Sequence, residues 1–169
     1  MGLRSLKRPT SWLGMLLAAG LLSSLLVQPA IAQIMLSQAP ASPSRLRADG
    51  SEVQGTTAGS YSLTQLAARD RRRKLCLGYG TQDPSHLLEL EADQGRLQIR
   101  VESGNDTTLL IQGPNGIDCN DNYTRDHRDA AITRSRWPAG LYRIWVGSFD
   151  QGDQVNYRLR VISSESAER

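Results

Sequence analysis

The sequence predicts an all-β domain, a two-sheet antiparallel sandwich of jelly-roll-like form with seven or eight short strands. Two observations predict it. Apolar and polar residues alternate with a period of two over several short runs, the pattern of strands with one buried and one solvated face. Turn-forming residues separate these runs at the spacing of roughly 8 to 12 residues that is typical of all-β sandwiches. No long helical pattern competes with this interpretation.

The strand signals are steady from about residue 75 onward, after a first element at residues 61–68 that fits either a strand or a short helix. An apolar run at residues 107–112 stops at Gly113-Pro114-Asn115-Gly116, which indicates a strand that enters a tight turn. The clean alternations occupy residues 88–91, 96–102, 142–146 and 157–161, and the other turn signals are at 93–95, 104–105, 138–140 and 152–153.

The first 32 residues have the composition of a secretory signal peptide. Three basic residues precede an uncharged, mostly apolar core at residues 12–27, and small residues flank a cleavage site after Ala32. An uncleaved anchor is the alternative, but the core is shorter than the roughly 20 residues of a spanning helix. We therefore expect export to the periplasm or the extracellular space, with no membrane span after signal cleavage.

The remaining chain is expected to form one domain with flanking segments. Residues 33–59 are rich in Ala, Ser, Pro, Gln and Gly, which predicts a flexible leader. Residues 60–163 carry the strand signals and form the predicted sandwich domain, and residues 164–169 form a C-terminal tail.

The basic character of the chain belongs to its export signal. Three of the 20 basic residues and none of the 17 acidic residues lie in residues 1–32, so the rest of the chain is balanced at 17 of each. A nucleic-acid partner is therefore not expected. One local basic run remains, Arg71 to Lys74, for which a solvated loop, an anionic-polymer or lipid patch, and a protease-sensitive site are the alternatives.

Cys76 and Cys119 are the two cysteines of the chain, and in an oxidising compartment a lone pair most often forms a disulfide. The bond would close a loop of about 43 residues and stabilise the fold by roughly 4 kcal/mol on the chain-entropy model. The alternative, a cysteine nucleophile with His86 or His127 as its base, lacks any local signature.

An acidic segment offers the oxygen ligands that calcium prefers. Asp118, Asn120, Asp121 and Asp129 are the candidate ligands of a calcium ion, the one cofactor that the sequence suggests. The segment lacks the glycine and the distal glutamate of an EF-hand loop. Clusters of Asn and Asp also form turns by bonding their own backbone, so that interpretation stays open.

The strand at residues 142–146 supplies the candidate binding residues. If Tyr142, Ile144 and Val146 face the core, Trp145 and Arg143 share the opposite face. An exposed Trp beside an Arg has the composition of a binding hot spot. The alternative is that the N-terminal segment covers Trp145.

The order of these pieces resembles a known family. The stretch from Asp106 to Phe149 contains DTTLLIQGPNG, then CNDN, then WPAGLYRIWVGSF. It resembles the bacterial pre-peptidase C-terminal domain, a small secreted β-sandwich found beside or behind exported peptidases, and the likeness covers about residues 55–163. The resemblance implies a sandwich fold and an accessory role, and it transfers no ligand set to this chain.

Two classes of function follow from the sequence. The first is a non-catalytic, exported binding or accessory module whose partner is an unknown extracytoplasmic protein or polymer. The alternatives are a small secreted hydrolase, with a site around His86, Asp129 and one serine, and a calcium-stabilised adhesion-type module. The sequence contains neither a G-x-S-x-G elbow nor an H-E-x-x-H helix, which favours the non-enzymatic interpretation.

Overall fold

The computed structural model describes residues 43–48 and 50–163. By its internal contacts the chain divides into two units, Met1–Pro40 and Ala41–Arg169, and all described residues belong to the second. The predicted signal peptide, the start of the predicted leader and the predicted C-terminal tail lie outside the described residues. The described part contains no helix that is long and apolar enough to cross a membrane.

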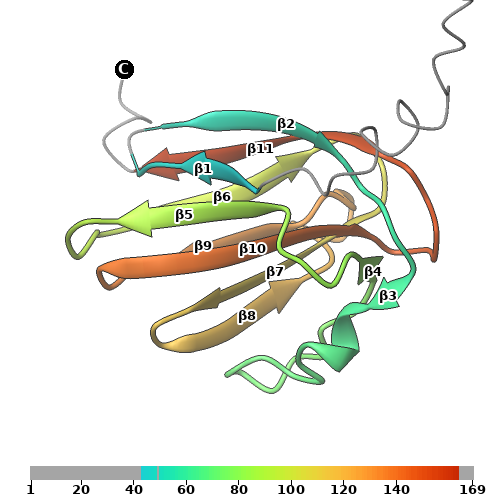
Figure 1. Ribbon diagram of the computed structural model, residues 1–169, viewed down its shortest axis with the longest axis horizontal. Coiled ribbons are helices and arrows are strands. Elements are labelled where there is room, and N and C mark those ends of the chain that lie inside the picture. The colour runs from blue at the N-terminus through green and yellow to red at the C-terminus, as the bar shows by residue number, and fades with distance from the viewer. Residues whose placement is uncertain (1–42, 49, 164–169) are drawn as a thin grey trace, which may run out of the picture. The chain divides into compact units, whose positions relative to one another are not determined.

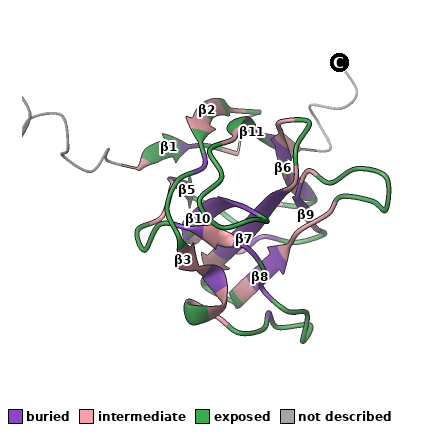
Figure 2. Ribbon diagram, turned by 90° about the vertical axis from the view of Figure 1, so that its right-hand side faces the viewer, coloured by how far each residue is buried: buried purple, intermediate pink, exposed green. Residues whose placement is uncertain are grey.

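Two β-sheets form the described domain, and the connecting segments carry most of its exposed residues (Figures 1 and 2). Sheet A contains β1 (Ser44–Leu46), β3 (Tyr61–Ser62), β4 (Tyr79–Gly80), β5 (His86–Leu90), β7 (Thr107–Gly113), β8 (Gly116–Asn120) and β10 (Gly140–Ser148). Sheet B contains β2 (Glu52–Thr56), β6 (Leu97–Glu102), β9 (Ala131–Arg134) and β11 (Asn156–Ser163). A single 3-10 helix, η1 (Leu63–Gln65), is the helical element of the described residues.

Strand β10 pairs with three other strands of sheet A. It pairs with β5 through residues 140–144, with β7 through residues 143–148, and with β4 at Ser148, while β8 extends the sheet beyond β7. Sheet B has the order β2-β11-β6-β9. The two sheets confirm the predicted all-β sandwich. Eight strands of four residues or more occur among the described residues, in agreement with the predicted seven or eight. The structure adds three shorter strands, and one of them, β1, runs parallel to β5.

The predicted flexible leader is wrong for the part of it that the structure describes. The segment forms an edge strand in each sheet, β1 beside β5 and β2 beside β11. These strands contribute few core side chains, chiefly Leu46 and Val53, and are held by backbone pairing, so alternation is weak in them. Gly55 has a packing role, because a Cβ atom there would overlap the ring of Tyr157 on β11.

The main core fills the space between the sheets. The alternating residues that the sequence assigned to one face are fully buried there, among them Leu88, Ile99, Ile144 and Leu159. Burial of apolar surface at about 25 cal/mol per Å² makes this layer the principal source of stability. The period-two pattern therefore predicts the inward face of the long strands correctly.

A second apolar cluster lies on the outer face of sheet A. The segment from β3 to residue 82, here called the covering segment, packs Leu63 and Cys76 against Leu110, Cys119 and Trp145. The predicted disulfide between Cys76 and Cys119 is present, with a Cα to Cα distance of 5.3 Å. It ties the covering segment to β8, so part of this sheet face is not in contact with solvent.

Candidate binding site

The outer face of β10 carries the residues that the sequence selected for binding. Arg143 and Trp145 alternate with the buried Tyr142 and Ile144, as predicted, and Leu141 lies on their face of the strand. The register with β7 places Gln112 opposite Arg143 and Leu110 opposite Trp145. The sequence therefore predicted correctly which face of the strand these residues share.

The prediction that Trp145 is exposed is wrong. Its exposed fraction is 5% because the covering segment lies over it, and its Nε1 donates a hydrogen bond to the carbonyl oxygen of Gln82 at 3.2 Å. The alternative of an N-terminal cover was close to the observed arrangement, but the cover consists of residues after the predicted leader. Alternation along a strand defines a direction and carries no information about another segment that packs there.

A pocket of about 250 Å³ opens beside Trp145 at the edge of the covering segment. Its apolar lining is supplied by Leu66, Pro84, Leu110, Ile117 and Trp145, and its polar lining by Gln112 and Arg143. Arg143 is exposed, and among the described residues none forms a side-chain hydrogen bond or ion pair with it. The pocket thus combines an apolar interior with an uncompensated positive charge.

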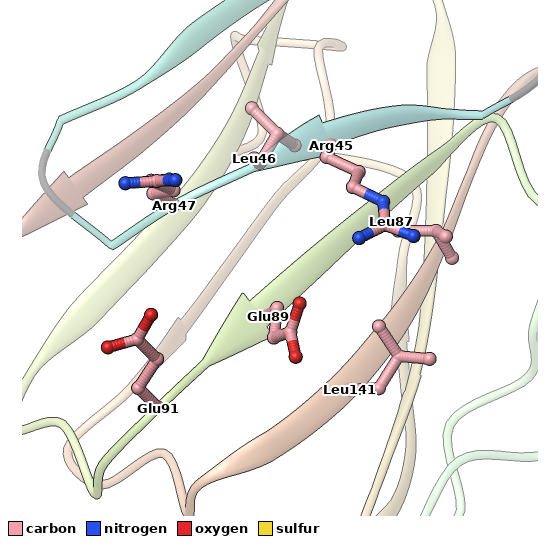
Figure 3. Close-up of a pocket in the computed structure, with 7 residues that line it drawn as sticks. All are labelled: Arg45, Leu46, Arg47, Leu87, Glu89, Glu91 and Leu141. Atoms are coloured by element: carbon pink, nitrogen blue, oxygen red, sulfur yellow. The ribbon is translucent and has the colours of Figure 1, made fainter.

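A second hollow, of about 150 Å³, lies further along the same sheet (Figure 3). Figure 3 shows Arg45 and Arg47 on the β1 side and Glu89 and Glu91 on the β5 side of this space, with Leu141 on β10. Leu141 is 44% exposed. The face beside β10 therefore offers apolar contact and charges of both signs to a partner.

His86 and Asp129, the two named residues of the hydrolase hypothesis, are not brought together by any described contact. His86 is buried on β5, where its Nε2 lies 2.8 Å from the hydroxyl of Tyr157. Burial lowers the pKa of His86 to about 4. Asp129 instead accepts hydrogen bonds from Ser103, Gly104 and Thr107, and although burial raises its pKa, these bonds together hold the pKa below its usual value. Each group thus has a hydrogen-bond partner within the fold.

The four predicted calcium ligands are divided among separate hydrogen-bonding environments. Asp118 forms ion pairs with Arg71 and Arg134, whereas the side-chain oxygen of Asn120 accepts from Lys74 and from the backbone of Asp121. Within residues 43–48 and 50–163, no group of three or more acidic, His or Cys side chains is arranged to hold a metal ion. Calcium binding by Asp118, Asn120, Asp121 and Asp129 stays a prediction, which melting curves in excess calcium and in chelator would test.

The basic run from Arg71 to Lys74 lies in an exposed turn of the covering segment. The carboxylate of Asp70 accepts hydrogen bonds from the backbone of Arg72 and Lys74, both at 2.8 Å. Arg73 adopts a left-handed conformation with φ of 68°. Sequence reasoning missed this turn, although an Asp directly before a polar run is a known turn signal.

These features define a small β-sandwich domain with a disulfide-tethered covering segment and a pocket on its outer sheet. No family model matches the chain. A similar protein is an uncharacterised protein of Synechococcus elongatus, 37% identical over 68 residues, which are 40% of this chain and 47% of that protein. The chain thus matches about half the length of this curated relative.

A solved structure is also similar, the pre-peptidase C-terminal domain of the collagenase from Bacillus anthracis. The two share 15% sequence identity with a TM-score of 0.44, over 73% of this chain and 98% of that domain.

Proposed function

We propose that this chain is an exported, non-catalytic module that binds an extracytoplasmic protein through the outer face of sheet A. The observation that carries the proposal is the pocket between the covering segment and Arg143, which joins an apolar lining to a cation without an ionic partner among the described residues. Binding sites characteristically combine apolar surface with a few placed polar groups.

The chemistry of the pocket favours a polypeptide partner. An apolar space of about 250 Å³ suits an aliphatic or aromatic side chain, and Arg143 at its rim suits a neighbouring carboxylate. A neutral sugar polymer would be expected to stack on an exposed aromatic ring, whereas Trp145 is covered. The half-exposed Leu141 extends the apolar contact along β10.

Export and the absence of catalysis are supported by separate features. The first 32 residues have the pattern of a signal peptide, and the disulfide between Cys76 and Cys119 suits an oxidising compartment. His86 and Asp129 are each engaged in structural hydrogen bonds, which supports a binding role over the hydrolase alternative.

Capture from periplasmic and culture fractions, with the chain immobilised, tests the proposal. Arg143→Glu reverses the charge at the pocket, and Arg96→Glu makes the same change at an exposed position before β6 of sheet B. We expect the original chain and the Arg96→Glu variant to retain the same protein. The Arg143→Glu variant should retain at least tenfold less of it. The reason is that a charge reversal at an interface costs more than the roughly 1.4 kcal/mol that corresponds to a tenfold change in affinity. Equal retention by both variants, at equal thermal stability, would contradict the proposal.

A further inference from the structure

A second site lies at the edge of the sandwich between β8 and β9, which is closed by polar groups. Asp118 on β8 and Arg134 on β9 both occupy inward positions of their strands, and their side chains are only 6% and 3% exposed. Arg134 Nη2 lies 2.6 Å from Asp118 Oδ2, and Arg71 Nε donates to Asp118 Oδ1 at 2.8 Å. One buried carboxylate thus lies between two guanidinium groups.

This ion pair leaves Arg134 incompletely satisfied. A guanidinium carries five N–H donors. The Nε of Arg134 has no hydrogen-bond partner among the described groups, whereas its Nη2 contacts Asp118 Oδ2 as an ion pair outside hydrogen-bond geometry. The side chain also packs over the ring of Trp137, with its Cζ 5.1 Å from the ring centroid. A buried donor without an acceptor is costly, so an acceptor placed beside Arg134 Nε would stabilise this arrangement.

A pocket of about 230 Å³ adjoins this guanidinium, and its lining is strongly basic. The lining residues are Arg71, Arg72, Asn115, Arg134, Ser135, Arg136 and Pro138. The backbone N–H of Arg71 donates to the carbonyl oxygen of Ile117, and that of Arg72 to the Asp70 carboxylate. The other residues come from the β7–β8 turn, from the end of β9 and from the segment after it. Three separate parts of the chain therefore supply the pocket.

The charges of the pocket do not balance. Four guanidinium groups line it, and the two carboxylates that pair with them are Asp118 and Asp93. The Asp93 pair with Arg136 is exposed on both sides, so solvent screens it and it neutralises the pocket only weakly. Arg72 has no side-chain partner among the described residues. Two positive charges are thus in excess, together with the donor groups of Ser135 and Asn115.

We infer that this pocket binds a phosphate or sulfate group, held by Arg72, Arg134 and Arg136. A doubly charged tetrahedral oxyanion matches the excess of two positive charges better than a single carboxylate does. Its several oxygens can accept hydrogen bonds from more than one guanidinium. The site lies on another part of the domain from the proposed protein-binding pocket, and the two sites share no lining residue.

Isothermal titration of the full chain with sodium phosphate, sodium sulfate and sodium acetate, at constant ionic strength, tests the inference. We expect saturable binding of phosphate and sulfate, and binding of acetate at least tenfold weaker. Arg72→Gln should weaken phosphate binding by roughly tenfold, the usual order for one charge-assisted hydrogen bond, and leave the melting temperature unchanged because Arg72 is exposed. Arg125→Gln, a change at an exposed arginine of another loop, is the matched control.

Absence of saturable phosphate and sulfate binding by the original chain would overturn the inference, as would equal losses in Arg72→Gln and Arg125→Gln. Two further arms separate the sources of the oxyanion. Binding to vesicles that contain phosphatidic acid, lost in Arg72→Gln, would assign a lipid headgroup. Binding to dextran sulfate with the same loss would assign a sulfated polymer.

Discussion

The two apolar clusters of the domain differ in how the sequence encodes them. The core between the sheets follows the period-two pattern of the long strands, and residues such as Ile99 and Leu159 are placed there by alternation alone. The smaller cluster on sheet A depends on the covering segment, whose strands β3 and β4 have only two residues each. The first cluster is encoded locally, and the second by a contact between distant segments.

Alternation along a strand shows which way its side chains point, but not which other segment covers them. It shows that Trp145 points away from the inter-sheet core, and it is silent on whether that side meets water. A covalent bond between Cys76 and Cys119 fixes the covering segment there. The stability of the outer cluster should therefore depend on this bond, whereas the inter-sheet core should persist without it.

The largest expected effect comes from removing the disulfide. The double variant Cys76→Ala, Cys119→Ala should lower the free energy of unfolding by about 4 kcal/mol. Without the cross-link between residues 43 positions apart, the unfolded chain gains conformational entropy. Hydrogen exchange should increase most in residues 63–82, and tryptophan emission should shift to longer wavelength as Trp145 meets water. An equal increase of exchange in β6 and β11 would show that the two clusters are not separable.

Trp145→Ala should lower the free energy of unfolding by about 3 kcal/mol, since it removes a large side chain from a packed environment. Chemical denaturation measures the change. Arg143→Ala on the same strand face is the control. A loss below about 1 kcal/mol for Trp145→Ala would mean that the covering segment contributes little packing energy.

The protonation of His86 should make the free energy of unfolding depend on pH. The pKa of His86 falls from 6.5 in the unfolded chain to about 4 in the folded domain because burial disfavours the charged ring. The unfolded state therefore binds more protons between these values, and stability is lost as the pH falls through this window. Between pH 7 and pH 5 the expected loss from this group is about 2 kcal/mol.

The measurement is the free energy of unfolding as a function of pH. His86→Gln should remove most of this dependence, whereas His127→Gln, a change at an exposed histidine in the loop after β8, should retain it. The same steep dependence in His86→Gln would assign the effect to the carboxylates instead.

The smallest effect is expected for Arg143. Arg143→Ala should change the free energy of unfolding by less than about 0.5 kcal/mol, because the side chain is exposed and forms no ion pair with the described residues. Thermal denaturation at low and moderate salt checks this. A larger loss would indicate that the side chain supports the covering segment as well as the proposed binding site.

Much of the fold could be predicted from the sequence, and the reasons for the exceptions are physical. Long strands such as β6 and β11 bury one face, so their pattern is visible, and a chain with two cysteines leaves one possible pairing. Strand β2 was missed because backbone pairing with β11 holds it and Gly55 makes room for Tyr157.

The candidate site was predicted only in part. Arg143 was correctly placed on the outer face of β10, but the pocket needs Leu66 and Pro84, which approach it from distant positions in the sequence. Asp118 was interpreted as a calcium ligand because it stands in an acidic segment. Its actual partner, Arg134, lies on the other sheet, and no local pattern joins the two.

The order of strands in sheet B has a consequence for the time course of folding. Strand β2 pairs with β11, the last strand of the described domain, and the side chains of Thr56 and Asn156 bond across 100 positions of the sequence. A chain delivered across a membrane from its N-terminal end would present residues 52–56 long before their partner emerges. Sheet B of such a chain can be completed only when nearly the whole domain has been delivered, which favours folding after translocation. Until then β2 has no partner strand, so it must be kept from pairing with other chains.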